Sequence, residues 1–129
     1  MFFNKINELG KRQDMPFKIG FDSCTIPAII NKCDNLSGVF YDSCEAGRFS
    51  AYITADMKMI PCSFENQSLK HAVDLKNVSV IDAWESNTFD DFRKHFTSHC
   101  SKCPKRDECL SGCPIVPQIT ICDRKECDI

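Results

Sequence analysis

The sequence predicts a small α+β domain, rich in cysteine, with a β-hairpin, two or three short helices and loops that can bind metal clusters. Three observations predict this class. Hydrophobic residues recur at helical spacing in short segments, strand-like segments flank one turn, and cysteines crowd the last third of the chain among prolines and a glycine. The length of 129 residues fits one domain, or one domain with a short leader.

Three short elements are predicted ahead of the main cysteine run. Residues 2–12 carry hydrophobic side chains at helical spacing, which predicts an amphipathic helix ending near Gly10. Residues 17–21 alternate between apolar and polar positions and predict a strand. Residues 27–33 fit one or two helical turns, because proline is tolerated in a first turn.

A hairpin is predicted in the middle of the chain. Residues 49–54 are strand-like, residues 55–58 are typical of a turn, and residues 59–62 return as a second strand. This arrangement places Cys62 at the end of the second strand.

Two helices are predicted next, and loops after them. Ser79 can cap a helix that includes Trp84, and Asn87 or Thr88 can cap the following one. That second helix carries three phenylalanines on one face: Phe89, Phe92 and Phe96. From residue 99 onward, prolines and a glycine predict loops and tight turns.

Charge and targeting signals narrow the function. The chain has 16 basic and 18 acidic residues, a formal net charge of −2, and therefore no electrostatic footprint for nucleic acid or a membrane. The N-terminal residues contain no apolar stretch typical of a signal peptide, and no transmembrane segment is present. We therefore expect a cytoplasmic protein in a reducing compartment, where thiols stay free and disulfides are disfavoured.

The cysteines are the most informative feature. Six of the ten lie in the last third as Cys100-x2-Cys103-x5-Cys109-x3-Cys113, Cys122 and Cys127, and four precede them: Cys24, Cys33, Cys44 and Cys62. Ten thiols exceed the needs of one tetrahedral ion and suit two centres with four ligands each. Zinc and iron–sulfur clusters both take four thiolates, so spacing alone leaves both open.

Seven of the cysteines occur in an order that resembles the SPASM domain: Cys44, Cys62, Cys100, Cys103, Cys109, Cys113 and a last cysteine. The SPASM domain is the C-terminal auxiliary-cluster module of many radical SAM enzymes that modify peptides and proteins. The likeness covers roughly residues 40–129 and includes the hairpin ending in Ile60-Pro61-Cys62 and the segment Val80-Ile81-Asp82-Ala83-Trp84. It implies two auxiliary 4Fe-4S clusters that relay electrons or bind substrate. The implied partners are a peptide or protein substrate and a radical SAM core domain, in cis or in trans.

The resemblance also implies ligands. The first cluster would take Cys44, Cys62 and Cys113, and its fourth ligand would be Cys24 or Cys33, unless that iron is open to solvent or substrate. Cys24 and Cys33 are equally well explained as small buried hydrophobic residues. The second cluster would take the remaining family positions, with Cys127 preferred to Cys122 as the last: Cys100, Cys103, Cys109 and Cys127.

The chain departs from the family in two places. Met57 stands five residues before Cys62, where family members usually carry glycine, so we expect another turn type that uses Asp56. The Cys-x3-Cys-x2-Cys triplet that holds the SAM-cleaving cluster is missing, so the chain is not expected to be catalytic alone. We expect residues 1–37 to be a leader from a preceding core domain and residues 38–129 to be the cluster-binding module. The alternative is a zinc-stabilised interaction domain without a redox role.

Overall fold

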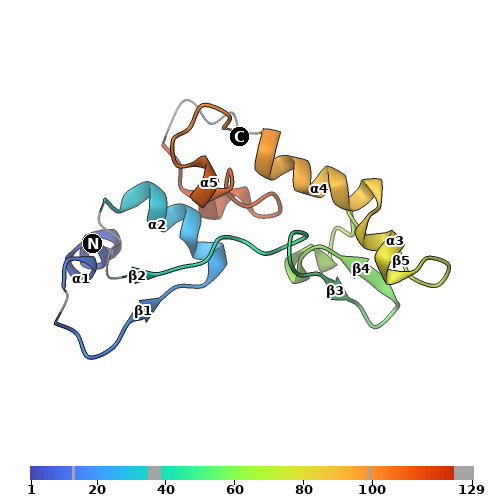
Figure 1. Cartoon of the computed structure of the whole chain (residues 1–129), viewed down its shortest axis with the longest axis horizontal. Coiled ribbons are helices and arrows are strands. Elements are labelled where there is room, and N and C mark those ends of the chain that lie inside the picture. The colour runs from blue at the N-terminus through green and yellow to red at the C-terminus, as the bar shows by residue number, and fades with distance from the viewer. Residues whose placement is uncertain (13, 35–38, 99, 124–129) are drawn as a thin grey trace. The chain divides into compact units, whose positions relative to one another are not determined.

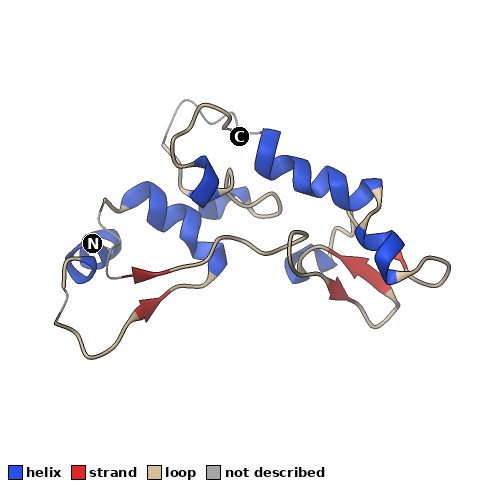
Figure 2. Cartoon of the chain, viewed as in Figure 1, coloured by secondary structure: helices blue, strands red, loops and turns tan. Residues whose placement is uncertain are grey.

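The computed structural model describes residues 1–12, 14–34, 39–98 and 100–123 and contains two compact units (Figures 1 and 2). Unit 1 is formed by Met1–Cys44 together with His99–Ile129, and unit 2 by Glu45–Ser98. Short helices and a small three-stranded antiparallel sheet confirm the predicted α+β class. The boundary between residues 37 and 38 stays a prediction.

The first half of unit 1 follows the sequence pattern closely. Helix α1 spans Phe2–Gly10, strand β1 spans Ile19–Gly20, and the 3-10 turn η1 (Ser23–Thr25) leads into α2, Ile26–Lys32. Pro27 lies in the first turn of α2, as expected, where its missing N–H removes no helical hydrogen bond. Strand β2 (Val39–Phe40) was not predicted, and it pairs in parallel with β1.

The second half of unit 1 contains two short helical turns where only loops are predicted. These are α5, Arg106–Cys109, and the 3-10 turn η3, Pro117–Thr120. Helix α2 packs against both (Figure 1). The Lys105 ammonium donates to the carbonyl of Ile30, near the C-terminal end of α2, which favours a positive charge there. The cysteine-bearing loops therefore pack against a helix that precedes them by some 70 residues in the sequence.

Unit 1 buries its core between α1, α2 and α5. The buried members of this core are Ile6, Ile26, Ile29, Ile30, Cys33 and Cys109. Most of them come from α1 and α2, so the apolar faces of these helices meet the end of α5. Burying four isoleucines stabilises the unit by about 1.5–3 kcal/mol each before the entropy of ordering the chain is counted.

Unit 2 contains the predicted hairpin. Strands β3 (Tyr52–Ile53) and β4 (Lys58–Ile60) are antiparallel, and a third strand that was not predicted, β5 (Val73–Asp74), pairs with β4. The 3-10 turn η2 (Ser63–Asn66) follows the hairpin directly. Helices α3, Val80–Trp84, and α4, Asn87–Ser98, complete the unit.

One predicted cap in unit 2 is confirmed and the other is wrong. The Ser79 hydroxyl accepts a hydrogen bond from the N–H of Asp82 at 3.1 Å and caps α3 as expected. Helix α4 begins at Asn87, so neither Asn87 nor Thr88 caps it. Ser86 takes that place, and its hydroxyl accepts from the N–H of Phe89 at 3.4 Å. Serine and asparagine are both good caps, so the local sequence did not separate them.

The predicted aromatic face of α4 forms the interior of unit 2. Phe89 and Phe92 are almost fully buried, and Phe89 packs with Met59 of β4 and Ala83 of α3. Arg93 braces the helix, since its guanidinium donates to the carbonyls of Gly47 (2.6 Å) and Trp84 (2.8 Å). The helix therefore holds the segment after Cys44 and the end of α3 together.

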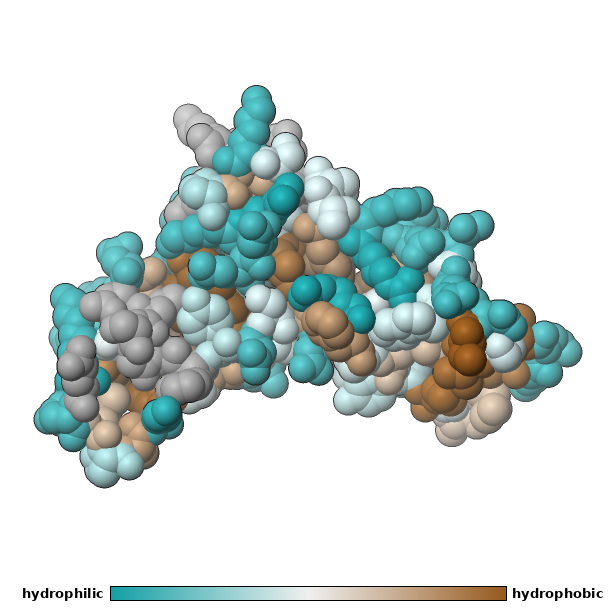
Figure 3. Space-filling model, viewed as in Figure 1, coloured by the Kyte–Doolittle hydropathy of each residue, from teal (hydrophilic) through white to brown (hydrophobic). Residues whose placement is uncertain are grey.

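Unit 2 also exposes several large apolar side chains, and brown surface is visible over it in Figure 3. The most exposed include Phe49, Tyr52, Ile53, Phe64, Val80 and Ile81. Apolar surface of this kind is typical of a face that meets another protein or a ligand. Within the described part of the chain, no helix is long and apolar enough to span a bilayer.

The expected turn type at Met57 is wrong. Met57 adopts the left-handed conformation, with φ of 64°, that the family's glycine would take. Hydrogen bonds hold it there: Met57 N–H donates to the carbonyl of Thr54 at 3.0 Å, and Leu75 N–H donates to the carbonyl of Met57 at 2.8 Å. The Asp56 carboxylate still takes part, because it accepts from the Thr54 hydroxyl at 2.6 Å and pairs with Lys58.

Substituting Met57→Gly is expected to stabilise unit 2 by about 0.5–1 kcal/mol. A residue other than glycine in the left-handed conformation destabilises the fold by roughly 1–2 kcal/mol. Glycine removes this strain, but its greater conformational freedom in the unfolded chain offsets part of the gain in stability. Urea unfolding followed by circular dichroism measures the change. Met57→Ala is the matched control, because it removes the same side chain and keeps the strained φ. Equal midpoints for the two variants would contradict the argument.

Candidate metal centre

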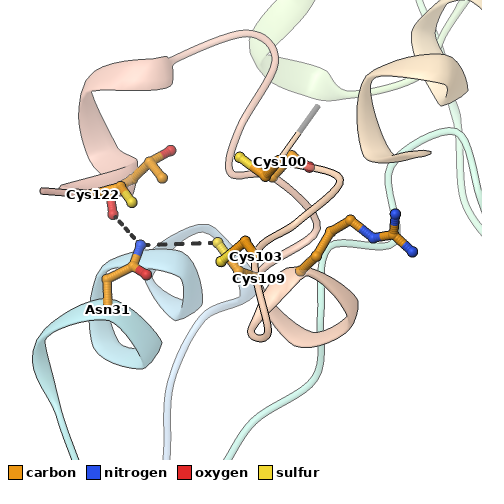
Figure 4. A pocket seen from close by; sticks show the side chains of 8 residues that line it. Asn31, Cys100, Cys103, Cys109 and Cys122 are labelled. Atoms are coloured by element: carbon orange, nitrogen blue, oxygen red, sulfur yellow. Dashed lines mark hydrogen bonds between the residues drawn. The ribbon is translucent and has the colours of Figure 1, made fainter. Parts of the chain in front are cut away.

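Four cysteine side chains line one pocket in unit 1 (Figure 4). They are Cys100, Cys103, Cys109 and Cys122. The empty space of this pocket is about 270 Å³, including the part that is open to solvent. Cys100 and Cys109 are buried, and Cys103 and Cys122 are half-buried. We call these four the pocket cysteines.

Tight turns in the backbone bring three of the pocket cysteines together. Cys103 N–H donates to the carbonyl of Cys100 at 2.9 Å, and Arg106 N–H donates to the carbonyl of Cys103 at 3.1 Å. Helix α5 then carries Cys109 back to the pocket one turn later. Cys100 has φ of 52°, a left-handed conformation that only a strongly determined turn imposes on a cysteine.

The three residues between Cys109 and Cys113 are all left-handed: Leu110, Ser111 and Gly112 have φ of 53°, 61° and 82°. Glycine is required at the last position. A Cβ at Gly112 would lie 2.2 Å from Oγ1 and 2.9 Å from Cβ of Thr120. This close approach lets the Thr120 hydroxyl accept a hydrogen bond from Cys113 N–H at 3.2 Å. The loop that joins Cys109 to Cys113 is therefore strained and tightly packed.

A second group of cysteines also belongs to unit 1. Cys24, at η1, lies close enough to Cys113 and Cys44 for their charges to act on it. Burial, then the hydrogen bond and charge of Asp22, then Cys113 and Cys44 raise the pKa of Cys24 to about 11. Without metal, Cys24 is therefore a neutral thiol near pH 7, and metal binding has to release its proton. We call Cys24, Cys44 and Cys113 the second group.

Hydrogen bonds hold the members of this second group. The Asp22 carboxylate accepts from Cys24 N–H at 2.9 Å, and the sulfur of Cys113 accepts from Val116 N–H at 3.2 Å. The segment before Cys44 is tied to α5: the Tyr41 hydroxyl donates to the Glu108 carboxylate at 2.8 Å, and the Ser43 hydroxyl donates to the Glu108 carbonyl at 2.9 Å. The hydrogen bond from Tyr41 to Glu108 raises the pKa of the tyrosine.

The structure treats Cys33 differently from Cys24. Cys33 is only 2% exposed, packs in the core of unit 1, and its thiol donates to the carbonyl of Phe3 at 3.8 Å. Burial, followed by the charge of Asp34, raises its pKa. These are the surroundings of a small hydrophobic side chain. Cys127 lies outside the described residues.

Cys62 belongs to unit 2, where a buried carboxylate braces the backbone after it. Glu65 N–H donates to the carbonyl of Cys62 at 3.0 Å, and the Glu65 carboxylate accepts from the backbone N–H of His71 at 3.1 Å. The His71 ring contacts the same carboxylate oxygen at 2.6 Å. Sequence patterns gave no signal for this pair, because a glutamate six residues from a histidine is common on surfaces.

The described cysteines offer soft sulfur donors, but they are not arranged around a single ion. None of the nine cysteines in the described ranges is in a disulfide. One side-chain amide, that of Asn31, faces the sulfur of Cys109, and one backbone N–H, that of Val116, faces the sulfur of Cys113. Among residues 1–12, 14–34, 39–98 and 100–123, no three Cys, His, Asp or Glu side chains are grouped closely enough to hold a single metal ion.

Cysteines gathered by tight loops are typical of proteins that bind a metal centre through thiolates. The particular class follows from a family comparison: residues 44–104 match the model of the SPASM iron–sulfur cluster-binding domain. This segment therefore matches the SPASM family, whose members are iron–sulfur cluster-binding domains. Searches of curated proteins and of solved structures found no match.

The matched segment contains four of the predicted ligands: Cys44, Cys62, Cys100 and Cys103. Two precede it, Cys24 and Cys33, and four follow it: Cys109, Cys113, Cys122 and Cys127. The structure nevertheless brings Cys109 and Cys122 to the same pocket as Cys100 and Cys103. Two polar residues at this pocket, Asn31 and Thr120, were missed by sequence reasoning, because nothing in their neighbourhood distinguishes them from surface residues.

Proposed function

We propose that the chain is the auxiliary-cluster module of a radical SAM enzyme that modifies a peptide or protein, and that it binds two 4Fe-4S clusters. The observation that carries this proposal is the division of thiols at one short loop. Cys109 faces the pocket cysteines, while Cys113, four residues later, lies in the second group. Two groups support two centres rather than one, and the match to an iron–sulfur cluster-binding family favours clusters over two zinc ions.

The proposed ligands follow these groups. The pocket cysteines, Cys100, Cys103, Cys109 and Cys122, would hold one cluster. Cys24, Cys44 and Cys113 of unit 1 would contribute to the other. The family resemblance, rather than any contact in the structure, adds Cys62 to that cluster. Burial of Cys33 in an apolar core supports Cys24 as the fourth ligand of that cluster. We choose Cys122 over Cys127 because Cys122 lines the pocket.

When bound, such clusters supply an acceptor or relay for single electrons. The residues of this chain would tune and shield them. Val116 N–H faces the sulfur of Cys113, and burial of Cys100 and Cys109 limits the access of water to the pocket. Hydrogen bonds to sulfur and exclusion of solvent are two of the means by which proteins set the potential of a cluster.

The proposed partners are a radical SAM core domain, in cis or in trans, and the peptide or protein that it modifies. The sequence lacks the Cys-x3-Cys-x2-Cys triplet, so the radical has to be generated elsewhere. Exposed apolar side chains on unit 2, such as Tyr52, Ile53 and Ile81, support a protein or peptide partner.

Anaerobic reconstitution followed by iron and sulfide analysis tests the cluster proposal. We expect about eight irons and about eight sulfides per chain, with the brown colour of iron–sulfur proteins. Two tightly bound zinc ions without sulfide would instead indicate a zinc-stabilised interaction domain. The partner proposal is tested separately, by mixing the reconstituted chain with a core that carries the triplet and following the mass of its precursor peptide.

A further inference from the structure

Asn31 of α2 lies at the edge of the pocket, outside the matched segment 44–104 (Figure 4). Its side-chain amide nitrogen donates to the sulfur of Cys109 at 3.9 Å and to the carbonyl of Thr120 at 3.2 Å. The orientation of the amide follows from chemistry, because a backbone carbonyl only accepts hydrogen bonds. The NH2 end must therefore face Thr120, and the same end reaches the sulfur.

The surroundings of Cys109 make this donor important. Cys109 is 9% exposed, so water has little access to its sulfur, and the Asn31 amide faces that sulfur. A donor that faces a buried sulfur favours the extra negative charge of a reduced cluster on that sulfur.

Asn31 is fixed by more than one contact. Helix α2 packs against α5 and η3, and the Lys105 ammonium donates to the carbonyl of Ile30, next to Asn31. The carbonyl of Thr120 keeps the amide in place, while the Thr120 hydroxyl accepts from Cys113 N–H. A donor held on a packed helix does not need to reorganise when charge arrives on the sulfur.

We propose that Asn31 raises the reduction potential of the cluster held by the pocket cysteines, by donating a hydrogen bond to the sulfur of Cys109. Helix α2 is then part of the cluster site, although it precedes the matched segment. The inference rests on the proposed function, since it needs a redox-active cluster in this pocket. Asn31 acts through Cys109 and is a positioning and tuning residue.

The test is a redox titration of the anaerobically reconstituted full chain, followed by electron paramagnetic resonance. Asn31→Leu removes the donor at similar size, and Asn31→Asp replaces it with an acceptor that adds negative charge. We expect both variants to bind as much iron and sulfide as the parent chain. The potential of one cluster should fall in both, further in Asn31→Asp. Asn31→Gln, which keeps the amide, should recover part of the shift.

The other cluster is the internal control, and its potential should stay unchanged. Full iron content with an unshifted potential in Asn31→Leu and Asn31→Asp would overturn the inference and leave the proposed function intact. Loss of iron in both variants, with Asn31→Gln behaving alike, would assign Asn31 a purely structural role through Thr120 and overturn it as well. Failure of the parent chain to bind iron and sulfide would instead reject the proposed function, and this inference with it.

Discussion

Cys103→Ala and Cys113→Ala are expected to remove different clusters, although the two residues lie in one short segment. Cys103 lines the pocket, whereas Cys113 belongs to the second group, where its charge influences Cys24. Each substitution deletes one thiolate and leaves an iron without its ligand, so each should lower iron content by about four per chain. Iron analysis and electron paramagnetic resonance of the reduced variants measure the loss.

The signals should sort by group. Cys113→Ala should affect the same signal as Cys24→Ala and Cys62→Ala, and Cys103→Ala the same signal as Cys109→Ala and Cys122→Ala. Cys33→Ala is the matched control, because Cys33 packs in the core, and it should keep all its iron while losing about 1 kcal/mol of stability. If Cys103→Ala, Cys109→Ala and Cys113→Ala all abolished one signal and spared the other, the ligands would form a sequential site and the proposed division would be wrong.

Gly112→Ala is expected to disrupt the loop between the two groups. The new Cβ meets the Thr120 side chain at 2.2–2.9 Å, and the φ of 82° is strained for alanine. Overpacking costs typically 1–3 kcal/mol and a left-handed residue about 1–2 kcal/mol. Hydrogen exchange of the reconstituted chain should show lost protection around residues 109–120, and a chelator should remove iron faster. Exchange within Glu45–Ser98 should change little, because unit 2 has its own core.

A double-mutant cycle identifies the cause. Thr120→Ala removes the two Thr120 side-chain atoms that lie nearest to the new Cβ, but it also deprives Cys113 N–H of its acceptor. If the clash dominates, Gly112→Ala with Thr120→Ala should be less destabilised than the sum of the single variants. Strict additivity would mean that Gly112 is needed for its backbone conformation alone.

Much of the local structure was predictable, because it depends on residues a few positions apart. Helical spacing of apolar residues identified α1 and α4, and the Ser79 side chain marked the start of α3. The hairpin that ends at Cys62 followed from alternation around a turn. The family resemblance placed Cys100, Cys103 and Cys109 at one centre, and these three side chains line one pocket.

Tertiary contacts decided the remainder. Met57 is left-handed against its own preference, because hydrogen bonds with Thr54 and Leu75 hold it there. From the sequence, Cys24 and Cys33 were equally good candidates for the fourth ligand of the first cluster. Their surroundings separate them, because Cys24 lies near other cysteines and Cys33 is buried in an apolar core.

The contact between Asn31 and Cys109 is the clearest case of a feature that the sequence alone could not predict. The two residues are 78 positions apart, and the carbonyl of Thr120 that orients Asn31 is 89 positions away. The sequence by itself indicated the cluster-binding family, the hairpin and the helices α1 to α4. Which distant side chains face those sulfurs was set by the packing of α2 against α5 and η3, because a hydrogen bond across such a separation leaves no periodic trace in the sequence.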